Sequence, residues 1–128
     1  MQPVSNRMTW ILLGAIGLIV VGLFMVKQAS FISAETARKH LAEGALVIDV
    51  RTAGEFAGGH VPGAINIPLD DLDAALPSRA PDKNRVVLLH CLSGGRSALA
   101  ASRMKSLGYS HVFNLGSYRR AEIVLGQK

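Results

Sequence analysis

The amino-acid sequence predicts an α/β domain with a mainly parallel sheet flanked by helices, preceded by one N-terminal transmembrane helix. Three observations lead to this prediction. Residues 8–26 contain no charged side chain. Short apolar runs at 45–50, 64–68, 85–90 and 111–115 do not alternate with polar residues, as is typical of strands buried on both faces. Helical patterns separate most of these runs, and strand–helix alternation favours parallel pairing.

The apolar segment near the N-terminus is long enough to cross a bilayer. As a helix, residues 8–26 would extend for about 28 Å at 1.5 Å per residue, close to the thickness of the hydrocarbon core. Arg7 and Lys27 flank the segment, and Trp10 has the position of an interfacial aromatic residue. We interpret it as an uncleaved anchor. A cleaved signal peptide is the alternative, which the length of the run and the lack of an Ala-x-Ala site disfavour.

The anchor divides the chain into a short N-terminus with the membrane helix (1–27), a linker (28–31) and a domain (32–128). Basic residues are slightly more numerous just after the apolar segment than before it. The positive-inside rule therefore favours a single-pass protein of the cell membrane with a cytoplasmic domain. One unpaired cysteine, Cys91, also suits a reducing compartment. A periplasmic domain is the alternative orientation.

The charge of the chain after the anchor is unevenly distributed. Residues 28–84 have a net charge of −3, and residues 85–128 have a net charge of +6. A basic half favours an anionic partner. Aromatic residues are sparse there and no nucleic-acid-binding motif occurs, so we expect a small anion and no nucleic acid. Four scattered histidines and one cysteine do not predict a metal site, and we expect no cofactor.

The first half of the domain begins with a helix. Ser33 has the position of an N-cap before a helical pattern at 34–43, and the strand at 45–50 follows. After the brief strand at 64–68, the acidic segment 69–76 predicts a short helix that ends near the next proline.

The second half has two strands around one longer helix. The strand at 85–90 precedes an amphipathic helix at 95–107, which Gly108 ends, and the run at 111–115 predicts the last strand. In α/β folds, ligands bind beyond the carboxyl ends of the strands. This directs attention to the residues that follow 85–90.

The segment after that strand has the composition of an anion-binding loop. It consists of Cys91, Leu92, Ser93, Gly94, Gly95, Arg96 and Ser97. Glycines permit the positive φ angles with which successive N–H groups face one centre. The helix N-terminus and the Arg96 guanidinium add positive charge. We therefore expect a lowered pKa for the Cys91 thiol and a nucleophilic role for its thiolate. A small, inert core cysteine is the alternative.

Three motifs in order resemble the rhodanese-like domain family. The loop fits the family pattern Cys-x-x-Gly-x-Arg-[Ser/Thr]. Residues 48–51 with Glu55 and Phe56 are similar to the family segment Asp-Val-Arg…Glu-[Phe/Tyr]. Residues 59–68 are similar to its signature Gly-His-Ile-Pro-Gly-Ala-x-Asn-[Ile/Leu]-Pro. The resemblance covers about residues 32–116, but no Trp follows it, so we expect a shortened final helix.

The resemblance implies a rhodanese-like fold and a sulfurtransferase. Cys91 would take a sulfane sulfur from thiosulfate or another small anionic donor, such as a persulfide, and become a persulfide itself. Cyanide or a thiol-bearing acceptor, which can be a protein, would then remove that sulfur. Loop amides and Arg96 would stabilise the terminal sulfur, and Ser97 would bond within the loop.

We assign Asp49, Arg51 and His60 to structural support of the site. A buried ion pair or a loop-anchoring hydrogen bond is the preferred interpretation for the first two, and a hydrogen bond to turn backbone for His60. A catalytic role is the alternative. Glu55 is expected at the surface or as a turn anchor, and His90 is expected to point away from the loop.

Two other functions stay open. The first is a membrane-anchored docking or redox-sensing module without enzyme activity, which an intact loop disfavours. The second is a cysteine phosphatase or arsenate reductase, as in relatives of similar fold whose loop has five residues between cysteine and arginine. Four residues separate Cys91 from Arg96, and the tighter loop favours sulfur over a tetrahedral oxyanion.

Overall fold

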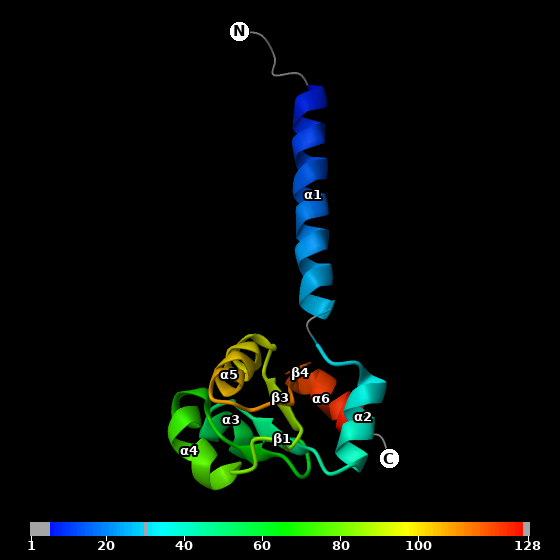
Figure 1. Cartoon of the computed structure of the whole chain (residues 1–128). Helices are drawn as coiled ribbons and strands as arrows, with labels where there is room; N and C mark the ends of the chain where they lie inside the picture. Colours follow the sequence, from blue (N-terminus) through cyan, green and yellow to red (C-terminus); the bar gives the residue numbers. More distant parts are fainter. Residues whose placement is uncertain (1–5, 30, 127–128) are drawn as a thin grey trace. The chain divides into compact units, whose positions relative to one another are not determined.

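The computed structural model describes residues 6–29 and 31–126, in two compact units, Met1–Ser30 and Phe31–Lys128. The first unit contains helix α1 (Asn6–Ala29; Figure 1). Its Asn6–Val26 portion is long and apolar enough to cross a membrane, with a mean hydropathy of 2.5. A signal sequence near an N-terminus has the same properties. Ser30, which belongs to the expected linker, lies outside the described residues.

The second unit contains a four-stranded sheet in which every pair of neighbouring strands is parallel, as the sequence predicts. Its strands in spatial order are β2 (Ile65–Asn66), β1 (Leu46–Asp49), β3 (Val87–Cys91) and β4 (Val112–Ser117). The register between β3 and β4 shifts after Leu89, so that Leu89 pairs with Asn114 but His90 pairs with Gly116. Leu115 is the extra residue, and such a bulge bends the strand next to the end of β3.

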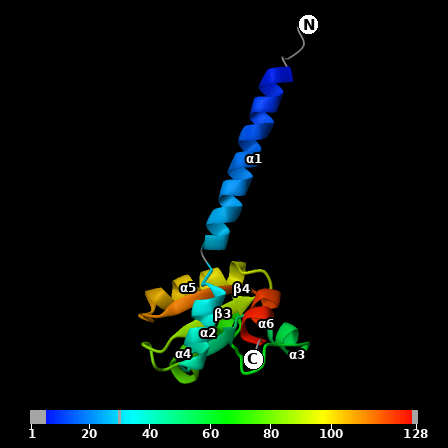
Figure 2. The same cartoon turned by 90° about the vertical axis from the view of Figure 1, so that its right-hand side faces the viewer.

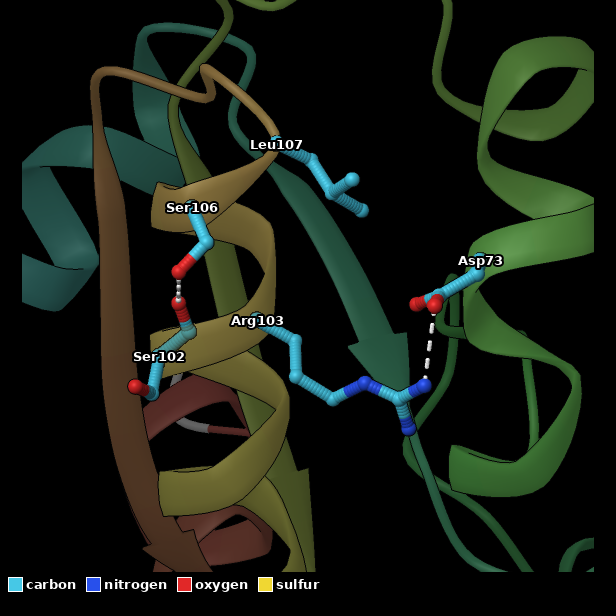
Figure 3. Close-up of a pocket in the computed structure, with 5 residues that line it drawn as sticks. All are labelled: Asp73, Ser102, Arg103, Ser106 and Leu107. Carbon is cyan, nitrogen blue, oxygen red and sulfur yellow. Dashed lines mark hydrogen bonds and ion pairs between the residues drawn. The ribbon is translucent and has the colours of Figure 1, made fainter.

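Helices cover both faces of the sheet (Figures 1 and 2). They are α2 (Ala34–Ala42), α3 (Ala53–Ala57), the 3-10 turn η1 (Leu69–Asp71), α4 (Leu72–Arg79), α5 (Gly95–Ser106) and α6 (Tyr118–Gly126). Helices α4 and α5 pack on one face, and α2 and α6 pack on the other. Figure 3 shows a surface pocket between α4 and α5, where Arg103 of α5 pairs with Asp73 of α4 at 2.9 Å.

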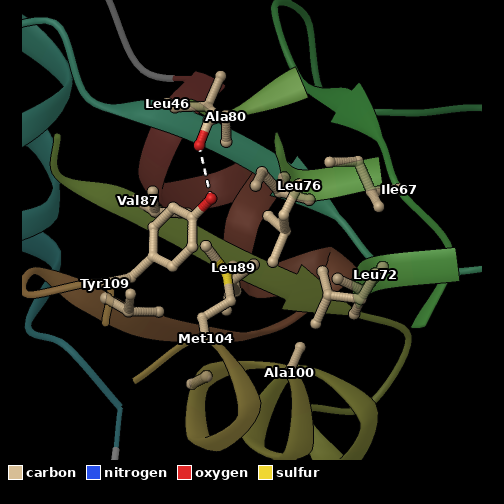
Figure 4. Packing of buried hydrophobic residues seen from close by; sticks show 14 of the residues in the cluster. Leu46, Ile67, Leu72, Leu76, Ala80, Val87, Leu89, Ala100, Met104 and Tyr109 are labelled. Atoms are coloured by element: carbon tan, nitrogen blue, oxygen red, sulfur yellow. Dashed lines mark hydrogen bonds between the residues drawn. The ribbon is translucent and has the colours of Figure 1, made fainter. Parts of the chain in front are cut away.

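Apolar clusters on the two faces explain why the strand sequences are unbroken apolar runs. Leu89 of β3 packs with Leu72, Leu76 and Met104 beneath α4 and α5 (Figure 4). Its neighbour Leu88 packs on the opposite face, beneath α2 and α6. Successive strand residues point to opposite faces, so a strand that is covered on both sides is apolar over most of its length. The buried polar residues of these strands are Asp49, His90 and Asn114. Burial of each of the apolar side chains stabilises the fold by about 1.5–3 kcal/mol.

The helix predicted at 69–76 is longer than expected. The chain forms η1 and then α4, which continues through Pro77 to Arg79. Proline removes one N–H of the helix, but Ala80 N–H still donates to Leu76 C=O at 2.9 Å. Leu76 is fully buried in the core and holds this turn in place. Tertiary packing therefore overrides the proline, and the expected end of the helix is wrong.

The short helix α3 is not predicted from the sequence. Glu55 N–H donates to Thr52 Oγ1 at 3.2 Å, and Thr52 N–H donates to Glu55 Oε1 at 3.1 Å. These reciprocal bonds form a capping box, for which Thr-x-x-Glu is the sequence signal. The helix of five residues is too short for an apolar periodicity to reveal it.

The two ends of the domain pack against each other. The final helix, expected to be shortened, spans nine residues and buries Ala121 and Val124 in the cluster that also includes Ala37 of α2. Phe31, which the sequence analysis places in the linker, packs inside the domain against two glycines. Of the residues expected in the linker, 28 and 29 belong to α1 and Phe31 belongs to the second unit.

Candidate active site

Cys91 ends the central strand β3, at the carboxyl edge of the sheet where the sequence analysis places the site. Residues 92–94 then turn the chain into α5, which begins at Gly95. Gly94 has a φ of +99°, a left-handed conformation that a side chain disfavours. In this conformation Gly94 N–H donates to Cys91 Sγ at 3.0 Å. Of the two adjacent glycines, one makes the turn and the other starts the helix.

Hydrogen bonds to Cys91 Sγ favour the thiolate. The residue is fully buried, and burial alone raises the pKa of its thiol. Hydrogen bonds from the Ser97 hydroxyl and from the N–H groups of Ser97, Gly94 and Ser93 outweigh burial, so that the pKa of Cys91 lies below its ordinary value. This net direction agrees with the sequence expectation. The sulfur is therefore both covered and activated.

Asn114 is a component of the site that the sequence analysis did not single out. Its Oδ1 accepts hydrogen bonds from the Ser97 hydroxyl at 2.7 Å and from Gly116 N–H at 2.9 Å. Its Nδ2 donates to Gly94 C=O at 3.2 Å. A polar residue inside the apolar run at 111–115 was the available signal. Asn114 thus links β4 to Gly94 at the end of the turn and to Ser97 in the first turn of α5.

The Ser97 hydroxyl has one proton and several acceptors. Asn114 Oδ1 at 2.7 Å is closer than Cys91 Sγ at 3.5 Å, so the proton points mainly to the amide oxygen when the thiol is neutral. A thiolate is a stronger acceptor and attracts the same proton. The backbone donor Gly94 N–H, at 3.0 Å, needs no such reorientation. The main chain of the loop is therefore the fixed part of the anion site.

Replacement of Ser97 by alanine is expected to raise the pKa of the Cys91 thiol, because one donor to the sulfur is lost. Iodoacetamide alkylation of Cys91 near neutral pH should slow, and its pH profile should move to higher pH. The free energy of unfolding should fall by about 1 kcal/mol, since Asn114 also loses a hydrogen bond. Ser102→Ala, in the exposed part of the same helix, is the matched control. Superimposable profiles for Ser97→Ala and the unmodified chain would contradict this expectation.

Arg96 forms an ion pair that the sequence analysis did not foresee. Its Nη1 and Nη2 donate to Glu55 Oε1 and Oε2 at 2.7 and 3.0 Å. The hydrogen bonds from Arg96 lower the pKa of Glu55 to about 2, with a further contribution from Thr52. Because the pKa of Glu55 is about 2, its carboxylate stays ionised through the pH range in which a glutamate ordinarily takes up a proton. The ion pair is lost only as the pH falls toward 2. Glu55 compensates the charge of Arg96 and joins the N-termini of α3 and α5.

Asp49 and Arg51 form a buried ion pair beside the site, the structural arrangement preferred for them from the sequence. Arg51 Nη2 lies 2.7 Å from Asp49 Oδ2 and donates to Gly59 C=O at 2.8 Å. The guanidinium carbon lies 4.3 Å from the centre of the Tyr118 ring. Asn66 Nδ2 donates to the carbonyl groups of both Asp49 and Arg51. The pair thus connects the segments that follow β1, α3 and β4.

The histidines near the site do not contact the sulfur. His60 Nδ1 bonds the carbonyl oxygen of Phe56 at 3.0 Å, and its ring stacks on the Phe56 ring, in a turn. His90 is fully buried, with Nε2 at 3.8 Å from Asp49 Oδ2. Burial lowers the pKa of His90, although the Asp49 carboxylate opposes this. His90 precedes Cys91 in the strand, and alternation turns their side chains to opposite faces.

A parallel α/β sheet with an activated cysteine at the end of its central strand defines a class of domains that handle small anions through a thiolate. The chain belongs to the rhodanese-like domain family, whose profile matches residues 33–120. The four-residue spacing between Cys91 and Arg96, the glycine turn and the buried pair of Asp49 and Arg51 all lie within the matched region.

Named relatives of this chain include sulfurtransferases. The chain is 39% identical over 72 residues to thiosulfate sulfurtransferase PspE of Escherichia coli, covering 56% of this chain and 69% of that protein. A solved rhodanese with anions from E. coli has 36% identity and a TM-score of 0.58, covering 60% of this chain and 91% of that one. Human single-domain sulfurtransferase TSTD1 has 31% identity and a TM-score of 0.65, covering 77% and 97%. The relatives thus support sulfur transfer in general for this chain.

Proposed function

We propose that the domain moves a sulfane sulfur from thiosulfate or a similar anionic donor to a thiol acceptor, through a persulfide on Cys91. The observation that carries this proposal is the hydrogen bond from Gly94 N–H to Cys91 Sγ at 3.0 Å. It places a fixed main-chain donor on a sulfur whose thiol pKa is lowered. A thiol whose pKa is lowered supplies more of the nucleophilic thiolate at a given pH, which reduces the need for a separate general base.

In the first half of the reaction, the Cys91 thiolate attacks the outer sulfur of thiosulfate. A bond forms between Sγ and that sulfur, and the sulfur–sulfur bond of the donor breaks. Its electron pair leaves with sulfite, and Cys91 becomes a persulfide. The outer sulfur of the persulfide then carries the negative charge. We expect the N–H groups of Ser93, Gly94 and Ser97, which surround Sγ in the resting site, to stabilise it.

In the second half, the acceptor thiolate attacks the outer sulfur of the persulfide. The bond to Sγ breaks, the electron pair returns to Cys91, and the acceptor leaves as a persulfide. Loop amides and the Ser97 hydroxyl stabilise the returning thiolate as they stabilise the resting one. Glu55 neutralises the charge of Arg96, so Arg96 adds little net positive charge near the sulfur. The Ser97 hydroxyl and the main-chain N–H groups of the loop therefore provide the stabilisation.

Phosphate or arsenate chemistry is the enzymatic alternative, and the loop disfavours it. A tetrahedral oxyanion requires donors arranged around several oxygen atoms. Here Gly94 N–H, the fixed donor, bonds the cysteine sulfur itself, and Glu55 occupies the Arg96 guanidinium with two hydrogen bonds. One additional sulfur atom needs less space and fewer donors.

Two assays on the full chain in detergent test the function. We expect thiocyanate formation from thiosulfate and cyanide, and no phosphate release from p-nitrophenyl phosphate. Phosphate release without thiocyanate would replace sulfur transfer by phosphatase chemistry. Failure of both assays, together with no gain of one sulfur atom by intact mass after donor treatment, would favour a non-enzymatic docking or redox-sensing module.

We also propose that α1 anchors the domain to the cell membrane, with the domain in the cytoplasm. The support is an apolar helix of sufficient length at Asn6–Val26 and the basic residues that flank it. Protease treatment of intact and opened cells tests the orientation: the domain should be cleaved only after opening. Cleavage in intact cells would place it outside, and a mature protein that lacks α1 by mass would identify a signal peptide.

A further inference from the structure

Phe31 lies directly against the loop that surrounds Cys91. A Cβ atom added at Gly94 would lie 3.0 Å from Cζ of the Phe31 ring, and one added at Gly116 would lie 3.1 Å from its Cε2. Real Cβ atoms avoid such short contacts, so the ring occupies the space that side chains at both glycines would need. The ring therefore packs on the bare main chain of both the loop and the end of β4.

Backbone contacts fix the position of Phe31 independently of its own side chain. The next residue, Ile32, donates its N–H to Asn114 C=O at 3.0 Å. Arg120 Nη2 donates to Ile32 C=O at 2.6 Å, and the same guanidinium lies 5.8 Å from the centre of the Phe31 ring. The segment before α2 is thus tied to β4 and α6, and it holds the ring against the glycines.

The Phe31 ring restricts the motion of Gly94. Glycine has the widest conformational freedom of any residue, and Gly94 donates its N–H to Cys91 Sγ while its own φ is left-handed. Asn114 holds the carbonyl oxygen of Gly94, and the Phe31 ring covers its α-carbon. Without the Phe31 ring, Gly94 would lose the apolar contact that limits its motion.

We infer that Phe31 is a positioning residue for the proposed sulfur transfer: its ring holds Gly94 in the turn that directs a main-chain donor at Cys91 Sγ. The inference rests on the proposed function for its consequence in turnover. The positions of the Phe31 ring, Gly94 and Cys91 Sγ do not depend on which sulfur donor the domain uses.

The test compares Phe31→Ala, Phe31→Leu and Phe113→Ala in the full chain. We expect Phe31→Ala to move the pH profile of Cys91 alkylation to higher pH and to slow thiocyanate formation about tenfold, a loss equal to one hydrogen bond to a charged group. Phe31→Leu keeps most of the apolar volume and should restore most of both. Phe113, a half-buried ring that stacks on His40 at 5.3 Å, is the matched control.

Phe113→Ala should lower the melting temperature but leave the alkylation profile in place. An unshifted profile for Phe31→Ala, or an equal shift for Phe113→Ala, would overturn the inference, because the ring would then act on stability alone. Should Phe31→Ala fail to fold, an unshifted profile for Phe31→Gln, which replaces the ring by a flexible polar chain, would overturn it equally. The alkylation profile needs no sulfur donor. It therefore separates failure of this inference from failure of the proposed function, which the thiocyanate assay and the intact mass after donor treatment report.

Discussion

Cys91→Ser is expected to abolish sulfur transfer. A serine hydroxyl forms no persulfide, and its oxygen is not ionised at neutral pH, so both halves of the proposed reaction lose their nucleophile. Thiocyanate formation should fall by at least ~10³-fold, to the rate without protein. The intact mass after thiosulfate treatment should show no gain of one sulfur atom, in contrast to the unmodified chain.

The fold of Cys91→Ser should persist, since the Gly94 N–H can donate to the new oxygen as it does to sulfur. We expect a change of about 1 kcal/mol in the free energy of unfolding, measured by denaturant titration. Thiocyanate formation by a folded Cys91→Ser protein would refute the persulfide mechanism. Loss of activity through unfolding alone would be visible in the same titration.

Arg51→Met is expected to cause the largest loss of stability. The substitution leaves the Asp49 carboxylate buried, with 0% exposure and without its guanidinium partner. Breaking a buried pair in this way costs about 3–5 kcal/mol, because the remaining charge is uncompensated. Denaturant unfolding of the full chain should show this loss as a lower midpoint.

Two further variants test the cause of that loss. Arg103→Met removes a similar ion pair from the surface, where both partners are largely exposed, and should cost no more than about 1 kcal/mol. The double variant Asp49→Leu/Arg51→Met removes both buried charges and should be more stable than Arg51→Met alone. If the double variant is instead the less stable one, packing rather than charge dominates at this position.

Much of the fold follows from local pattern. The runs that contain Leu88 and Leu89 predict strands buried on both faces, and the structure confirms a parallel sheet with a core on each side. The glycine loop after β3 predicts a left-handed turn and a donor aimed at Cys91, and Gly94 provides both. These features depend on a few consecutive residues, so a single sequence contains them.

Other features depend on contacts between distant segments. Glu55 and Arg96 are 41 positions apart, and nothing in either motif indicates that their side chains meet. Asn114 reaches the loop because β4 pairs with β3, which places Asn114 opposite Leu89 and close to Gly94. Pro77 stays helical because Leu76 is buried. In each case the deciding interaction is tertiary, and the local sequence does not name the partner.

The complete burial of Cys91 has a kinetic consequence. In the proposed reaction, the donor has to reach a sulfur with 0% exposure in line with the donor bond that breaks, so the residues around Cys91 have to move aside first. The frequency of that opening sets an upper limit on turnover at saturating donor. Between the two proposed half-reactions, the same cover would slow the access of every thiol to the persulfide, so that the acceptor also has to wait for the loop to open.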